Sequence, residues 1–183
     1  MQAAKVPHYT VTEYLLLERD GEIRHEYING ELFNMVGASR AHNMLASKLV
    51  MLLGNHLDGT ACRIFQSDMK VWIEAANCFY YPDLMVCCES VEDEPDEYYE
   101  TRPKVLVEIL SPSTAKRDDS EKRRNYQALS SLQEYVLFSQ DQPWVVVYRR
   151  QGSFWLRIEL SSEDDLELAS LDFSVSVKSI YPT

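Results

Sequence analysis

A short apolar run broken by one carboxylate constrains the fold of this chain more than any other feature. The run Val105–Leu110 reads Val-Leu-Val-Glu-Ile-Leu. Because both alternating faces are otherwise apolar, the run predicts a strand covered on both sides, at the centre of a sheet. Glu108 is the exception, and an unpaired buried carboxylate is costly. Glu108 is therefore a candidate metal ligand, with a tight ion pair to a core Lys or Arg as the alternative.

Helices and further strands are predicted on both sides of this run. Apolar residues at helical spacing predict a short helix over Thr10–Arg19 and a long one over Ser39–Leu57, with Ser39 as its N-cap. Asn29-Gly30 predicts a hairpin within Arg24–Met35. Other strands are predicted over Arg63–Glu74, Tyr80–Cys88, Glu134–Phe138, Trp144–Arg150, Phe154–Leu160 and Leu171–Val177.

The remaining segments complete a mixed α/β fold. A helix is predicted within Ser113–Ser131, starting near Asp118–Ser120, and loops are predicted over Glu89–Pro103 and the acidic run Ser161–Glu167. The chain of 183 residues is most simply one domain, residues 1–183, built on one central mixed sheet flanked by helices. An N-terminal hairpin and extra C-terminal strands extend that sheet.

The net charge argues against a generic nucleic-acid binder, whereas a local basic cluster leaves DNA binding possible. The net charge is −11, and non-specific affinity for nucleic acid comes from Lys and Arg side chains that neutralise phosphates. Lys116-Arg117 and Lys122-Arg123-Arg124 form a local basic cluster beside the central strand, so DNA stays possible.

Segments that would direct the chain to a membrane or out of the cell are not apparent. No apolar run approaches the roughly 18 residues of a membrane span, and the first ten residues lack the apolar core of a signal peptide, so we expect a cytoplasmic protein. The four cysteines form no CxxC pair, which predicts free, buried thiols in a reducing compartment. They are Cys62, Cys78, Cys87 and Cys88.

Three residues could form a metal-dependent nuclease site. Asp83 and Glu108 are suitable ligands for Mg²⁺, which takes carboxylate oxygens, provided that their strands pair. Phosphodiester cleavage uses such a cation to neutralise the phosphate and to generate hydroxide. Lys122, on the following helix, could position water or stabilise charge in the transition state. Each residue alone also has an ordinary structural explanation, and only the combination favours a site.

Motifs along nearly the whole chain resemble the Uma-two family of restriction-endonuclease-like proteins, within the PD-(D/E)XK nuclease superfamily. These motifs include Tyr9–Tyr14, Tyr27–Leu32, Ala41–Asn43, Ser67–Val71, Tyr81–Asp83, Val107–Thr114, Glu121-Lys122 with Tyr126, Leu132–Tyr135 and Val147–Arg149. The resemblance implies a restriction-endonuclease-like core and a Mg²⁺- or Mn²⁺-dependent endonuclease that acts on double-stranded DNA.

The resemblance places Asp83 and Glu108 at the metal-ligand positions. The superfamily's usual lysine, two residues after the second acid, is here Leu110. The resemblance therefore implies that Lys122 points back to the site from the helix, with Lys70 as the alternative. Lys122 and Tyr126 are four residues apart and share a helix face, which allows this geometry.

Four other residues are possible supporting members of the site. Glu26 could add a third carboxylate, or be a surface strand acid, and His42 could contact phosphate or water, or be structural. Ser111 begins a Ser-Pro-Ser-Thr turn that could contact phosphate or merely cap a helix. Tyr126 could support the site or simply pack.

Two functions remain open from the sequence. The first is the DNA endonuclease, expected to be a homodimer because cutting both strands of a duplex favours two sites. The second is a catalytically silent DNA- or protein-binding module on a nuclease-like scaffold, which the acidic balance and the displaced lysine favour. Nucleotide-binding and serine-hydrolase motifs of the GxGxxG, GxxxxGK[ST] and GxSxG types are absent from the sequence.

Overall fold

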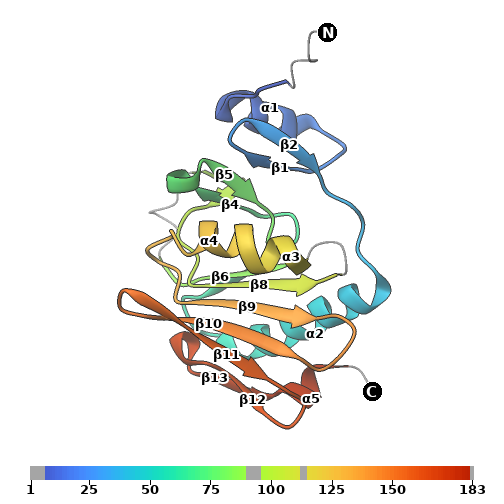
Figure 1. Cartoon of the computed structure of the whole chain (residues 1–183), viewed down its shortest axis with the longest axis vertical. Coiled ribbons are helices and arrows are strands. Elements are labelled where there is room, and N and C mark those ends of the chain that lie inside the picture. The colour runs from blue at the N-terminus through green and yellow to red at the C-terminus, as the bar shows by residue number, and fades with distance from the viewer. Residues whose placement is uncertain (1–6, 90–95, 112–114, 182–183) are drawn as a thin grey trace.

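A six-stranded mixed sheet forms the centre of the molecule (Figure 1). The computed structural model describes residues 7–89, 96–111 and 115–181. The order β11-β10-β9-β8-β6-β3 places Val105–Leu110 inside the sheet, as predicted, with β8 and β9 parallel and the other pairs antiparallel. The strands are β3 (Arg63–Gln66), β6 (Leu84–Cys87), β8 (Val105–Leu110), β9 (Glu134–Ser139), β10 (Val145–Gln151) and β11 (Phe154–Leu160).

The prediction of one sheet is wrong, because the described residues form two more. A five-stranded sheet has the order β2-β1-β5-β4-β7, and β12 pairs with β13 alone. The five strands are β1 (His25–Ile28), β2 (Glu31–Asn34), β4 (Lys70–Ile73), β5 (Cys78–Tyr80) and β7 (Tyr99–Glu100), and the pair is β12 (Asp165–Leu168) with β13 (Phe173–Ser176). The mixed α/β class is confirmed, with helices flanking mixed sheets.

One bent hairpin passes from the six-stranded sheet to the five-stranded sheet. Gln66 pairs with Leu84 in the first sheet and Val71 pairs with Tyr80 in the second, so four residues on one side face three on the other. This extra residue is a β-bulge, which bends a strand and redirects its side chains. The predictions of unbroken strands over Arg63–Glu74 and Tyr80–Cys88 are therefore wrong at the bend.

Local chemistry explains where the hairpin bends. Ser67 has a φ of +49°, which a strand does not allow, and its N–H donates to the carbonyl of Asp83 at 3.3 Å. Pro82 lacks the N–H that a ladder requires. Each of the two strands is therefore interrupted at the same level of the hairpin.

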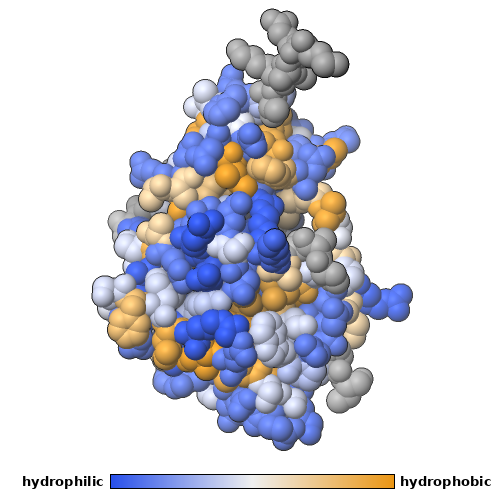
Figure 2. Space-filling view, viewed as in Figure 1, coloured by the Kyte–Doolittle hydropathy of each residue, from blue (hydrophilic) through white to orange (hydrophobic). Residues whose placement is uncertain are grey.

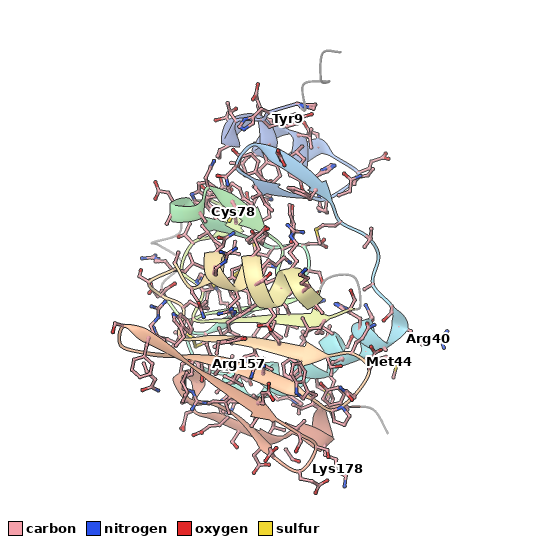
Figure 3. The ribbon with its side chains drawn as sticks, viewed as in Figure 1. Tyr9, Arg40, Met44, Cys78, Arg157 and Lys178 are labelled. Carbon is pink, nitrogen blue, oxygen red and sulfur yellow. A yellow bond between two sulfur atoms is a disulfide. The ribbon has the colours of Figure 1, made fainter. Side chains whose placement is uncertain are left out.

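Helices cover both faces of the six-stranded sheet. On one face lies α2 (Arg40–Leu57), capped as predicted by Ser39 Oγ, and it buries Leu45, Leu49, Leu53 and Leu57 against the sheet. At the start of this helix, Arg40 and Met44 point away from the sheet (Figure 3). The opposite face carries a continuous helical segment of α3 (Ala115–Arg117), the π-helical turn η3 (Asp118–Lys122) and α4 (Arg123–Tyr126).

The helical segment begins earlier than predicted. It starts at Ala115, whose N–H donates to the carbonyl of Ser111 at 3.0 Å, rather than near Asp118–Ser120. The other helices are α1 (Val11–Asp20), the 3-10 turns η1 (Glu74–Ala76) and η4 (Ala169–Leu171), and α5 (Val177–Ile180). Thr10 closes a capping box with Glu13 at the start of α1.

The acidic run Ser161–Glu167 is partly a strand, which the loop prediction missed. Leu166 and Leu168 of β12 are buried in the core beneath α2, while Asp165 and Glu167 are exposed. Alternation over four residues is the signature of a strand with one buried face, and the neighbouring acids obscured it. The predicted loop Glu89–Pro103 likewise contains β7, and its residues 90–95 lie outside the described part of the chain.

Two of the four cysteines form a disulfide, so the prediction of four free thiols is wrong. Cys62 and Cys88 are bonded, whereas Cys78 and Cys87 are free and buried. The bonded pair continues the β3–β6 ladder, in which Arg63 faces Cys87. Directly opposite residues of such a ladder lie within disulfide reach. Within residues 7–89, 96–111 and 115–181, no helix combines the length and the apolar character needed to cross a membrane.

Candidate active site

The pairing of β6 with β8 brings the two predicted acids together. Leu84 faces Val107 in this antiparallel ladder, so Asp83 stands one step further on, at the level of Glu108. Residues opposite each other in such a ladder project from the same face of the sheet. Asp83 and Glu108 therefore share the face that the helical segment of α3, η3 and α4 covers. Figure 2 shows hydrophilic residues gathered over that segment, in the middle of the view.

Glu108 is held by two side chains of the helical segment. Lys122 Nζ donates to Glu108 Oε1 at 3.1 Å, and the hydroxyl of Tyr126 donates to the same oxygen at 2.8 Å. Lys122 and Tyr126 reach one carboxylate because residues four apart lie on one helix face. The side chain of Glu108 is almost completely buried, at 4% exposed.

Glu26 and Asp118 complete a buried ionic cluster around Lys122. Lys122 Nζ lies 2.8 Å from Glu26 Oε1 and 3.5 Å from Asp118 Oδ1. Arg117 pairs with the second oxygen of Glu26 at 2.8 Å. Glu26 comes from β1 of the five-stranded sheet, so this cluster joins the two sheets through their charged side chains.

Asp83 has a separate set of partners. The backbone N–H of Ile109 donates to Asp83 Oδ2 at 2.7 Å, and His42 Nε2 lies 3.1 Å from the same oxygen. This hydrogen bond to Asp83 raises the pKa of His42 above its ordinary value. His42 stands in the first turn of α2, whose cap at Ser39 fixes its backbone.

The cluster controls the protonation of its members. Burial raises the pKa of Glu108 well above its ordinary value, with Asp118, Asp83 and Glu26 adding to the rise and Lys122 opposing it. Burial alone would lower the pKa of Lys122, but the carboxylates of Glu108, Glu26 and Asp118 raise it above its ordinary value. Lys122 is therefore an ammonium group, which can donate hydrogen bonds but cannot accept a proton.

The donor set fits a hard divalent cation. Within the described residues, Asp83 Oδ1 and Glu108 Oε2 receive no hydrogen bond, so each carboxylate keeps one oxygen for a ligand. Glu108, Glu26 and Asp118 surround Lys122, Arg117 pairs with Glu26, and His42 lies beside Asp83, so the site holds more acidic side chains than cationic ones.

Two carboxylates, Asp83 and Glu108, are enough protein ligands for magnesium. No group of three or more His, Cys, Asp or Glu side chains in the described ranges is arranged to hold a metal. Mg²⁺ needs only one or two carboxylates, because waters and substrate phosphate complete its octahedron.

The remaining predicted residues lie elsewhere or only border the site. Lys70 stands on β4 with its Nζ 5.5 Å from the centre of the Tyr81 ring, so Lys122 rather than Lys70 contacts Glu108. Ser111 directly follows β8, and its carbonyl accepts a hydrogen bond from the N–H of Ala115, at the start of the helical segment. The rest of the Ser-Pro-Ser-Thr turn, residues 112–114, lies outside the described part of the chain.

Two members of the cluster were not identified from the sequence. The sequence indicates Asp118 only as part of a helix start, and Arg117 only as part of a basic cluster. The spacing Asp118, Lys122, Tyr126 places all three on one helix face, and this repeat was the available signal. The π-helical turn over Asp118–Lys122 shifts the phase of that face, and such turns are frequent at functional sites.

Comparisons with known proteins identify the family of this chain. The model of the Uma2 family, described as "Putative restriction endonuclease", matches residues 11–178. Two uncharacterized proteins of Synechocystis sp., slr1290 and sll1609, are each 34% identical to the chain. The first match covers 98% of this chain and 94% of the relative, and the second covers 95% and 97%.

A solved structure shares the fold. The crystal structure of a protein from Anabaena variabilis, titled a putative nuclease belonging to DUF820, superposes with a TM-score of 0.75. The match covers 94% of this chain and 97% of the other, at 20% sequence identity. At that identity the likeness concerns the fold.

Proposed function

Because the chain belongs to the Uma2 family, described as "Putative restriction endonuclease", we propose that it is a Mg²⁺- or Mn²⁺-dependent endonuclease that hydrolyses phosphodiester bonds of double-stranded DNA. One observation carries this proposal. Asp83 and Glu108 share a face on neighbouring strands, and Lys122 from the covering helix donates to Glu108 at 3.1 Å. Two carboxylates and an ammonium group are the parts that phosphodiester hydrolysis requires.

The proposal gives each residue a distinct task. Asp83 and Glu108 would hold the cation through their oxygens that receive no hydrogen bond. A divalent cation held by these two residues would neutralise the scissile phosphate and would supply hydroxide near neutral pH. Tyr126 fixes the orientation of Glu108, and the N–H of Ile109 fixes that of Asp83.

Lys122 serves as a hydrogen-bond donor in this proposal. Its ammonium group is held between Glu108 and Glu26, so it can orient the attacking water or stabilise a phosphate oxygen. Since its pKa is raised, it does not act as the base that removes a proton from water. The proposal also includes a homodimer, in which two copies of the site cut the two strands, and a cytoplasmic location.

Cleavage of plasmid DNA tests this proposal. We expect the purified chain to nick or linearise supercoiled plasmid with Mg²⁺ or Mn²⁺ and to be inactive with EDTA. Asp83→Asn, Glu108→Gln and Lys122→Gln should each lower the rate by about 10²–10³-fold, the usual cost of losing a group that stabilises the transition state.

Lys178→Gln is the control, because it removes an exposed lysine of α5 that lies outside the basic cluster of Lys116-Arg117 and Lys122-Arg123-Arg124. The assignment is wrong if wild type cuts DNA and Asp83→Asn and Glu108→Gln cut equally fast. Circular dichroism of each variant verifies that the fold is retained.

A binding module without catalysis is the second candidate. The observation in its favour is that Lys122 and Tyr126 already occupy Glu108 Oε1, as in a structural ion pair. Calorimetric titration with Mg²⁺ and Mn²⁺ separates the two candidates. No binding at millimolar metal together with no cleavage supports the binding module, whereas metal binding that Glu108→Gln removes supports the endonuclease.

A further inference from the structure

Lys70 is buried away from the candidate active site and forms no ion pair with an acid of the described residues. Its side chain is 6% exposed, and within the described residues it makes no hydrogen bond or ion pair. Its ammonium group lies over the face of the Tyr81 ring, with Nζ 5.5 Å from the ring centre. An ammonium group removed from water without a partner is costly, so a buried lysine is normally paired.

A cavity of about 150 Å³ adjoins Lys70. It lies where α1, the α1–β1 connection and the bend of the long hairpin meet, and Lys70, Arg19 and Arg24 supply its cationic lining. A cavity of this volume is large enough for a benzene-sized molecule, and hence for a phosphate group.

The carboxylates that line this cavity form no ion pair with Lys70 within the described residues. Glu18 is occupied, because its Oε2 accepts from the Tyr81 hydroxyl at 2.6 Å and its Oε1 accepts from the His25 N–H at 3.0 Å. Asp68 is 83% exposed in its side chain and lies 3.8 Å from Arg24, so water screens it. Asp96 and Glu97 complete the acidic rim, and Glu97 is exposed.

We propose that this cavity is a binding site for a phosphate-type oxyanion, held by Lys70 with Arg24 and Arg19. The ligand supplies the acceptor that Lys70 lacks, and guanidinium groups match the geometry of a phosphate. The oxyanion is either a free phosphate or a phosphodiester of bound nucleic acid. The site is separate from the carboxylate cluster around Glu108.

Titration calorimetry with Lys70→Met tests the proposal. One arm uses inorganic phosphate, and the other uses a DNA duplex without terminal phosphates. We expect Lys70→Met to weaken binding of at least one of these ligands by about tenfold or more, the effect of losing a charge-assisted hydrogen bond. Weakened phosphate binding alone identifies the free ion, and weakened duplex binding identifies the phosphodiester.

Lys178→Met is the matched control, because Lys178 is an exposed lysine of α5 at the far end of the molecule (Figure 3). It should bind both ligands like wild type. Arg24→Gln is a second variant for the case that Lys70→Met does not fold, since Arg24 is 42% exposed and its replacement leaves the core intact.

The proposal is overturned if Lys70→Met, or Arg24→Gln in its place, binds both ligands as tightly as wild type. Loss of phosphate binding in Glu108→Gln but not in Lys70→Met also overturns it, because the anion would then occupy the carboxylate cluster. Retention of phosphate binding in Glu108→Gln together with its loss in Lys70→Met supports two separate sites. This outcome is independent of DNA cleavage.

Discussion

Glu108 is surrounded by groups that act on its charge in opposite directions. Burial and the neighbouring carboxylates favour its protonated form, and Lys122 favours its charged form. The net result is a raised pKa in the folded protein. An acid with a raised folded pKa does not affect stability below its unfolded pKa, about 4.3 for Glu. As the pH rises above that value, the unfolded chain releases the proton first, so the folded state loses stability.

We therefore expect Glu108→Gln to raise the melting temperature in the absence of divalent cations. The variant removes the cost that burial places on the charge of Glu108, while Lys122 keeps Glu26 and Asp118 as partners. Each pKa unit of the rise corresponds to about 1.4 kcal/mol, and each kcal/mol to roughly 2–4 °C for a chain of this size. The difference between variant and wild type should be close to zero near about pH 4 and grow toward about pH 8.

Differential scanning fluorimetry over this pH range measures the effect. Glu163→Gln is the control, because Glu163 is an exposed acid far along the chain. A variant that melts below wild type at neutral pH would show that the ion pair with Lys122 outweighs the burial of Glu108.

The sequence predicted residues of this cluster to different degrees. Glu108 stands out because it interrupts an apolar run. Lys122 is a candidate as a lysine on the following helix, and the family resemblance adds that it points back to the site. Asp118 neither interrupts an apolar run nor belongs to a family motif, and an acid near a helix start is common because it interacts favourably with the helix dipole. Asp118 is 2% exposed and begins the π-helical turn, and sequence periodicity at 3.6 residues does not predict where such a turn occurs.

At the scale of elements, the hairpin Arg63–Cys87 was the least predictable part of the fold. Its residues are strand-like throughout, and periodicity cannot show that Gln66 and Lys70 belong to different sheets. The helices α1 and α2 were predicted closely, because Thr10 and Ser39 cap them with side-chain oxygens. Local chemistry thus determined helix ends, whereas the assignment of strands to sheets depended on contacts distant in sequence.

The β3–β6 ladder makes a prediction about the cysteines. Protein denatured without a reductant should show two reactive thiols, from Cys78 and Cys87, because Cys62 and Cys88 are bonded. Reduction should raise the number to four. A colorimetric thiol assay before and after reduction measures both values, and Cys62→Ser provides the control. Four thiols without reduction would contradict the disulfide.

At the scale of the whole molecule, charge opposes the approach of DNA. The chain carries 29 acidic and 18 basic residues, so its average field repels phosphates. The candidate site offers phosphates little attraction, since the acidic side chains of Asp83, Glu108, Glu26 and Asp118 outnumber Lys122, Arg117 and His42. A divalent cation bound there would reduce the repulsion at the point where the proposed substrate binds.

DNA affinity should therefore depend on divalent cations. We expect a labelled duplex to bind at least about tenfold more tightly with Mg²⁺ than with EDTA at constant ionic strength, because the cation offsets buried negative charge. Fluorescence anisotropy measures the affinity, and a gel of the same samples verifies that the duplex is intact. Equal affinities with Mg²⁺ and with EDTA would show that the carboxylate cluster does not take part in DNA binding.

The bulge in the long hairpin limits how this chain can change during evolution. The four residues 67–70 face the three residues 81–83, and these short segments include both Asp83 and Lys70. Deletion of one residue between Gln66 and Lys70 would turn every later side chain of β4 to the opposite face. Substitutions there can accumulate while the number of residues stays fixed. Related chains should therefore vary in composition at this bend but contain no insertions or deletions.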